Sequence, residues 1–203
     1  MENPLGSLLQ QQNIAVQLYG LPGTYKTTFL TQTIRKKLEE GWNPIYLIDT
    51  SGNFPIIRLK SIKHLLQHMI VFQPKTLEEE ALLFDDLSIQ LHSQDSILFI
   101  DDVFRHTDLK NKDNIHLNSY ILAQIKSISR RISFPVILTN QARSFDENIR
   151  PFLQSLTLQY LDWHFLFEKS QKQNRILVTF FDHERYVLQR EHRIDSSGFL
   201  IDL

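Results

Sequence analysis

One stretch of the sequence has the residue types of a phosphate-binding loop. Residues 20–27 read Gly-Leu-Pro-Gly-Thr-Tyr-Lys-Thr, close to the pattern G-x-x-x-x-G-K-[ST]. In such a loop, backbone N–H groups at the mouth of a helix bind a polyphosphate, and the lysine reaches its β- and γ-phosphates. Lys26 and Thr27 hold the lysine and magnesium-binding positions, whereas Tyr25 stands where the pattern has its second glycine.

This loop predicts ATP and Mg²⁺ as cofactors. The Thr27 hydroxyl is expected to hold the metal ion. Tyr25 is expected to be strained if its backbone needs a positive φ, and its ring must then point away from the phosphates. The expected nucleotide-binding residues are Gly20, Leu21, Pro22, Gly23, Thr24, Tyr25, Lys26, Thr27 and Thr28.

Two further segments end in polar side chains suited to this chemistry. Residues 96–101 read as an apolar strand that ends in Asp101, a carboxylate that could hold the Mg²⁺ water shell. Asp102 is either a second functional carboxylate or a solvated neighbour. Gln141 follows another apolar strand and could bind a γ-phosphate, or it could be a cap or turn residue. Asp102 and Gln141 are therefore the candidate catalytic residues.

The elements that position these residues follow from the hydrophobic pattern. Strands at 14–19, 45–49, 69–73, 96–101 and 134–139 alternate with helices at 26–40, at 76–92 and around Ile121, Ile125, Ile128 and Ile132. Such alternation predicts parallel βαβ units. The last quarter instead predicts a strand meander at 163–167, 176–180 and 186–190, with a turn at 170–174. The expected fold is α/β: a mostly parallel central sheet flanked by helices and extended by C-terminal antiparallel strands.

Composition sets broad limits on function. The 203 residues are 42% hydrophobic, enough for one well-buried core. A net charge of −1 argues against bulk coating of nucleic acid, and the absence of cysteine excludes disulfides and thiolate metal sites. No apolar run could span a bilayer, and the first residues do not resemble a signal peptide. We therefore expect a protein without membrane contact, cytoplasmic or, in a eukaryote, nuclear.

In order and spacing, four motifs resemble the ATPase core of the RecA/RadA recombinase superfamily, and most of all its RadB-like archaeal paralogues. They are residues 20–27, Tyr46–Phe54, the Asp101 strand and Thr139–Gln141, and residues 193–202 are similar to the closing strand. The resemblance implies one RecA-like P-loop NTPase core over residues 1–203, without an N-terminal DNA-binding domain. The Asp101-Asp102 pair also resembles that of AAA+ ATPases, but no helical lid follows it.

Departures from the family pattern shape the expected function. Residues 46–54 match a segment that typically reads Y-I-D-T-E-G-x-F, and Ser51 replaces its water-polarising glutamate. Together with Tyr25, this implies an ATP-binding accessory protein in homologous recombination and DNA repair with weak or absent hydrolysis. Its implied partner is a recombinase or another recombinase paralogue, in a hetero-oligomer. The alternatives are an active ATPase completed by Asp102 or by a partner, and a scaffold whose vestigial loop is filled by Tyr25.

Two loops could face DNA by analogy with the family. The loops are residues 104–114 and 142–151, and their cationic candidates are Arg105, Lys110, Lys112, Arg143 and Arg150. Asp108, Asp113, Asp146 and Glu147 lie among these cations. A solvated loop of mixed charge is therefore the alternative interpretation.

Overall fold

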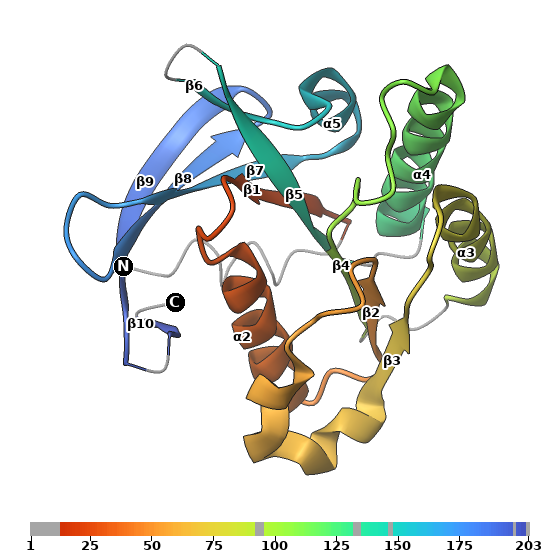
Figure 1. The fold of residues 1–203 in the computed structure, drawn as a ribbon. Coiled ribbons are helices and arrows are strands. Elements are labelled where there is room, and N and C mark those ends of the chain that lie inside the picture. Colours follow the sequence, from red (N-terminus) through yellow and green to blue (C-terminus); the bar gives the residue numbers. More distant parts are fainter. Residues whose placement is uncertain (1–12, 92–95, 132–134, 146–147, 197, 202–203) are drawn as a thin grey trace.

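The strands of the described residues form one ten-stranded sheet with helices on both faces (Figure 1). The computed structural model describes residues 13–91, 96–131, 135–145, 148–196 and 198–201. The strands are β1 (Ala15–Gly20), β2 (Ile45–Asp49), β3 (Met69–Phe72), β4 (Ile97–Asp101), β5 (Val136–Phe145), β6 (Asn148–Pro151), β7 (Trp163–Lys169), β8 (Arg175–Asp182), β9 (Arg185–Ile194) and β10 (Leu200–Ile201).

The order of the strands brings the predicted motifs to one edge of the sheet. The order is β10-β9-β8-β7-β1-β5-β4-β2-β3, with β6 paired to β5. Strands β3, β2, β4, β5, β1 and β7 pair in parallel, so that their carboxyl ends lie on the same side. Asp49 is in register with Asp101, and Gly20 with Gln141. Parallel sheets bind ligands at this edge.

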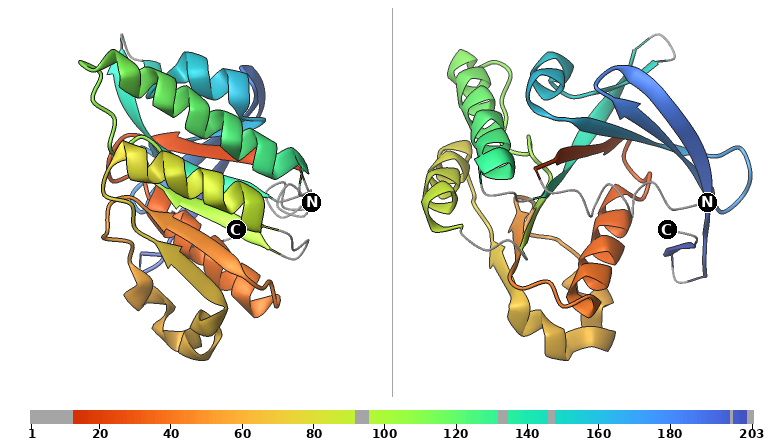
Figure 2. Two further views of the ribbon diagram at one scale, coloured as in Figure 1. Left: turned by 90° about the vertical axis from the view of Figure 1, so that its right-hand side faces the viewer. Right: turned by 180° about the vertical axis from the view of Figure 1, so that it is seen from behind.

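The helices divide between the two faces of the sheet (Figure 2). α2 (Lys26–Glu39) and the 3₁₀ segment η1 (Ile56–His68) cover one face, where Phe29, Leu30 and Leu59 pack on the sheet. α3 (Leu77–Gln90), α4 (Lys112–Arg131) and α5 (Gln154–Tyr160) cover the other face. Both faces are therefore buried, which is why the parallel strands read as nearly continuous apolar runs.

A side-chain cap marks the start of α3. The Oγ1 atom of Thr76 accepts a hydrogen bond from the Glu79 backbone N–H at 3.1 Å, which makes Thr76 the N-cap of α3. The Glu79 carboxylate accepts from the Lys75 N–H rather than from Thr76.

The predicted α/β class, parallel core and antiparallel C-terminal strands are confirmed.

In the last third of the chain one prediction was wrong, and one strand pairing and one helix were missed. As predicted, β7 begins the antiparallel meander through its pairing with β8, but it also pairs in parallel with β1, which the sequence pattern did not indicate. The helix α5, which the pattern did not reveal, makes the crossover. Residues 142–151 are not a simple loop: β5 continues to Phe145 and forms a hairpin with β6. The hairpin lacks apolar alternation because it projects beyond the core, so its strands gave no signal.

Several predicted positions lie outside the described residues. They are His92, Ile132, Phe134, Asp146, Glu147 and residues 1–12 and 202. None of the described helices is both long and apolar enough to span a bilayer.

Candidate nucleotide-binding site

The loop after β1 is shaped by close contact with β7. A Cβ atom at Gly20 would lie 2.3 Å from the carbonyl oxygen of Phe167, so only glycine fits there. Gly23 has a φ of 76°, a conformation that glycine adopts without strain. These two glycines fix the path of the chain into the first turn of α2.

Tyr25 occupies the last residue before the helix in a left-handed conformation, with φ 68° and ψ 17°. Its carbonyl accepts the first helical hydrogen bond, from the Phe29 N–H at 2.9 Å. The partly buried ring packs against the core on the α2 face, where Phe29 and Phe167 meet edge to face at 5.3 Å. The backbone thus follows a path suited to glycine, while the ring lies against the core.

Lys26 is the first residue of α2, and its side chain folds back over the loop. Its Nζ atom donates hydrogen bonds to the carbonyl oxygens of Gly20 (2.8 Å) and Leu21 (3.0 Å) and to Thr24 Oγ1 (3.4 Å). Burial lowers the pKa of Lys26 to about 8, although Asp101 and Asp102 act in the opposite direction. The ammonium group is therefore held by carbonyl oxygens with which phosphate oxygens could compete.

Thr27 and Asp101 face each other across the sheet edge. The Thr27 hydroxyl lies 3.1 and 3.3 Å from the two carboxylate oxygens of Asp101, and Thr139 also donates to that carboxylate. Burial raises the pKa of Asp101, and the hydrogen bonds from Thr139 and Thr27 oppose this effect. Within the described ranges no group of three or more His, Cys, Asp or Glu side chains could hold a metal ion. A hydroxyl and one carboxylate fit Mg²⁺, which usually keeps several waters and binds phosphates through few protein ligands.

Asp102 and Gln141, the two candidate catalytic residues, lie together. The Gln141 side-chain amide donates a hydrogen bond of 3.0 Å to Asp102 Oδ2. Thr50 fixes the adjoining backbone, because its hydroxyl accepts from the Asp102 N–H at 3.0 Å and contacts the carbonyl of Asp101 at 3.1 Å. Gln141 is exposed and Asp102 is half-buried, so both are accessible at the edge of the sheet.

Ser51 lies in a turn organised by a buried carboxylate. Its hydroxyl donates a hydrogen bond of 2.9 Å to Asp49 Oδ1, which also accepts from the Gly52 N–H. The other oxygen of Asp49 accepts from the Phe54 N–H and from the Gln73 amide. Asp49 is therefore fully used in shaping the turn, and Ser51 offers only a hydroxyl where a general base would be needed.

One cation near the loop was not among the residues predicted from the sequence. Arg58 Nη1 donates a hydrogen bond of 2.9 Å to Thr28 Oγ1, and its guanidinium lies 5.8 Å from the centre of the Phe199 ring. Arg58 belongs to η1. The apolar residues of η1 have only a weak periodicity, which gave no sign that this segment contacts the start of α2.

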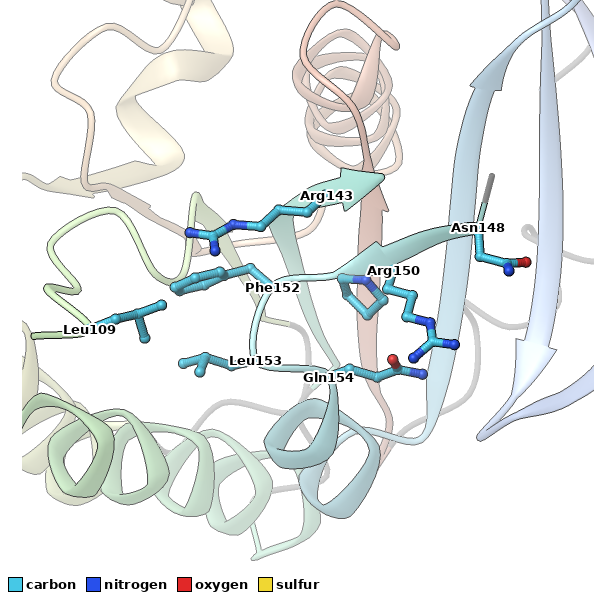
Figure 3. A pocket seen from close by; sticks show the side chains of 8 residues that line it. Leu109, Arg143, Asn148, Arg150, Phe152, Leu153 and Gln154 are labelled. Carbon is cyan, nitrogen blue, oxygen red and sulfur yellow. The ribbon is translucent and has the colours of Figure 1, made fainter. Parts of the chain in front are cut away.

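The nucleic-acid candidates separate into two groups. Arg143 and Arg150 are directly opposed in the β5–β6 hairpin and line a pocket of about 490 Å³ (Figure 3). Arg143 stacks on Phe152 at 4.8 Å, and neither arginine has an ion pair with a described residue. The other candidates, Arg105, Lys110 and Lys112, do not line this pocket; from their segment only Leu109 reaches it.

Comparison with known proteins assigns the chain to a protein family. The NB-ARC domain family matches residues 1–127, which contain both the phosphate loop and the Asp101 strand. The chain belongs to the NB-ARC domain family. These domains are P-loop NTPases, so the match agrees with a nucleotide-binding fold.

RadB proteins are similar to this NB-ARC chain over most of its length. Two relatives called "DNA repair and recombination protein RadB" come from Methanococcus maripaludis strain C5 (26% identical; 99% of this chain and 97% of the relative) and Pyrococcus abyssi (28% identical; 82% and 76%). A solved structure titled "Crystal structure of the RadB recombinase" superposes with a TM-score of 0.77, at 23% identity, over 96% of this chain and 94% of the other. The resemblance to RadB-like proteins and the RecA-like fold are confirmed.

The left-handed backbone at Tyr25 can be tested with two truncations. Tyr25→Gly and Tyr25→Ala both remove the ring, but only glycine adopts a positive φ without strain. We expect Tyr25→Gly to be more stable than Tyr25→Ala by about 1 kcal/mol, measured by urea unfolding. Equal stability of the two variants, or a more stable alanine variant, would contradict this conformation.

A buried carboxyl group on α3 gives a prediction about pH. Glu80 is fully buried, and neither of its oxygens has a hydrogen-bond partner in the described part of the chain. Burial, helped by the charge of Asp102, raises the pKa of Glu80 to about 8 from an ordinary value of 4.5. Between these values the folded protein binds a proton that the unfolded chain has lost, so the free energy of unfolding falls as pH rises.

We expect Glu80→Gln to remove this fall. The two proteins should be similarly stable near pH 5, and the variant should gain on the wild type by up to about 1.4 kcal/mol per pH unit between pH 5 and 8. Urea unfolding at several pH values measures the difference. Parallel pH profiles for the two proteins would show that Glu80 is not a buried neutral acid.

Proposed function

We propose that this protein binds ATP with Mg²⁺ and acts as a RadB-like accessory protein in homologous recombination and DNA repair, with slow or absent hydrolysis. One observation supports this above others: Lys26 lies within the loop, and Thr27 and Asp101 face each other beside it. Ser51 meanwhile stands where the related proteins' pattern has its catalytic glutamate. The site keeps the groups for binding and lacks one for catalysis.

Each retained group has a distinct role in the proposed complex. Backbone N–H groups at the start of α2 would bind the phosphates, where the helix dipole favours an anion. Lys26 would exchange its carbonyl partners for phosphate oxygens. Thr27 and Asp101 would hold Mg²⁺, which when bound neutralises phosphate charge. Arg58, anchored on Thr28, adds a cation on the outer side of the helix start.

The position of Tyr25 favours this proposal over a scaffold with a vestigial loop. A scaffold of that kind requires the ring to fill the phosphate cradle. The ring instead packs against the hydrophobic core, and the interior of the loop holds the Lys26 ammonium group.

The biological role rests on the relatives, whose names place them in DNA repair and recombination. For this chain we propose a recombinase or another recombinase paralogue as the partner, in a hetero-oligomer. DNA is a further proposed ligand, through Arg143 and Arg150. The proposed compartment is the cytoplasm, or the nucleus in a eukaryote.

Nucleotide binding is tested by titration with a fluorescent ATP analogue in the presence of Mg²⁺. We expect Lys26→Ala to weaken binding about 10- to 100-fold, the effect of losing a charged hydrogen bond. Lys36→Ala, which removes an exposed lysine at the other end of the same helix, is the control and should bind like the wild type. Equal, negligible binding by all three proteins would refute the proposal.

A phosphate-release assay on the wild type and on Asp102→Asn, with and without a recombinase, distinguishes binding from hydrolysis. The hydrogen bond between Gln141 and Asp102 makes a completed ATPase the second candidate function, because it places a carboxylate and an amide at the mouth of the site. We expect release near the background rate for wild type and for Asp102→Asn. Turnover that Asp102→Asn abolishes would favour the ATPase instead.

DNA contact is tested through the salt dependence of binding to a fluorescent oligonucleotide. If Arg143 and Arg150 each neutralise a phosphate, replacing either by glutamine should reduce the slope of log affinity against log salt by about 1. Arg130→Gln, at the exposed end of α4, should leave the slope unchanged. The same slope in all four proteins would exclude the hairpin from DNA binding.

A further inference from the structure

The carboxyl end of β7 brings a second lysine to the phosphate loop. β7 is the parallel neighbour of β1, and Phe167 is in register with Gly20. Two residues later, the Lys169 Nζ atom lies 3.9 Å from where a Cβ atom of Gly23 would be. The ammonium group of Lys169 is thus against the exposed tip of the loop.

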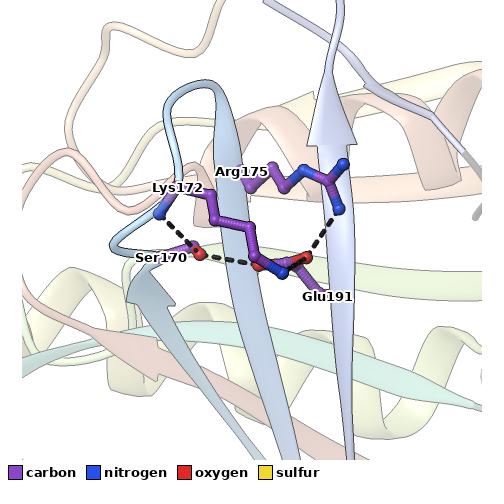
Figure 4. Close-up of polar contacts among 4 residues, drawn as sticks. All are labelled: Ser170, Lys172, Arg175 and Glu191. Carbon is purple, nitrogen blue, oxygen red and sulfur yellow. Dashed lines mark hydrogen bonds and ion pairs between the residues drawn. The ribbon is translucent and has the colours of Figure 1, made fainter.

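The ammonium group of Lys169 makes no hydrogen bond or ion pair with the residues that the structure describes. The other cations of the following turn are engaged. Glu191 Oε2 accepts from Lys172 Nζ at 3.1 Å and from Arg175 Nη1 at 2.6 Å (Figure 4). One carboxylate therefore binds two of the three cations, and the cation beside the loop is left available.

Glu191 also fixes the turn itself. Its Oε1 atom accepts a hydrogen bond of 2.7 Å from the Ser170 hydroxyl, and that hydroxyl accepts from the Lys172 N–H. The hydrogen bond from Ser170, followed by that from Lys172, lowers the pKa of Glu191 to about 2, so the carboxylate is charged at neutral pH. Ser170, the residue next to Lys169, is consequently held in place from β9.

The tip of the loop is where the outer phosphates would lie. Lys26, the residue that reaches β- and γ-phosphates in such loops, has its Nζ atom on the Gly20 and Leu21 carbonyls and near Thr24. The helix amides after Lys26 are left for the inner phosphates. Gly23, between these contacts, therefore borders the outer end of the chain of phosphates.

We propose that Lys169 is a second phosphate-binding cation, which contacts the terminal phosphate of a nucleoside triphosphate and selects it over the diphosphate, with Glu191 as the residue that positions it. This inference rests on the proposed function, since it needs nucleotide in the loop. A lysine is suited to the role because it is a flexible point charge that can follow a phosphate.

The test compares Kd values for a non-hydrolysable ATP analogue, β,γ-imido-ATP, and for ADP, both with Mg²⁺, by isothermal titration calorimetry. We expect Lys169→Gln to weaken binding of the triphosphate about tenfold and binding of ADP less than twofold, as for loss of one charge-assisted hydrogen bond. Lys172→Gln, in the same turn, should change neither by more than twofold. Because Lys169 is exposed, the variant should fold, which its thermal unfolding curve verifies.

Glu191→Gln separates a positioning role from a structural one. It should reduce the preference for triphosphate in the wild-type background and have no such effect in the Lys169→Gln background. An equal effect of Lys169→Gln on both nucleotides, or none on either, while the wild type still binds, would overturn this inference alone. Failure of the wild type to bind either nucleotide would instead overturn the proposed function, and with it this role.

Discussion

The Lys26 ammonium group rests on the carbonyl oxygens of Gly20 and Leu21, and the rest of the site is arranged around that contact. The contact requires the chain to turn sharply from β1 into α2. Tyr25, a residue with a side chain, adopts a positive φ in this turn. Tyr25 tolerates this conformation because its ring is packed against the core. Loss of a glycine from the loop is therefore offset by hydrophobic burial, and the loop keeps an interior lined by polar atoms.

Losing a glycine and losing a general base have different physical consequences. The first changes the conformational energy of the loop, and packing can compensate for it. The second removes a proton acceptor that the turn itself does not replace: Ser51 donates to Asp49, and Asp49 already accepts hydrogen bonds from the turn and from Gln73. Under the proposed function, a site with phosphate and metal ligands but without a base would bind a nucleotide and hydrolyse it slowly or not at all.

Much of the fold and of the candidate site could be predicted from the sequence because the signals were local. The apolar strands and the motifs at their carboxyl ends depend on residues close together in the chain. The parallel arrangement of the strands then brings Thr27 to Asp101 and Gln141 to Asp102. The parallel pairing of β7 with β1 was missed because a strand's own alternation of apolar and polar residues does not specify its neighbours in the sheet.

The positions of Arg58, Glu80 and Lys169 in the structure could not be predicted, and the reason is related. Each acts through a tertiary approach: a 3₁₀ segment returns to α2, an α3 side chain turns inward, and β7 runs beside β1. None of these approaches leaves a spacing pattern in the sequence. The motif residues identify the chemistry, whereas the surrounding charges emerge only from the fold.

A crystal structure with β,γ-imido-ATP and Mg²⁺ is the most direct measurement. We expect the triphosphate to lie on the amides at the start of α2, with Lys26 Nζ moved from the Gly20 and Leu21 carbonyls to phosphate oxygens and the Tyr25 ring unmoved in the core. A loop without nucleotide density at saturating concentration, with Lys26 still on those carbonyls or the Tyr25 ring turned into the loop, would contradict the proposal that this loop binds ATP.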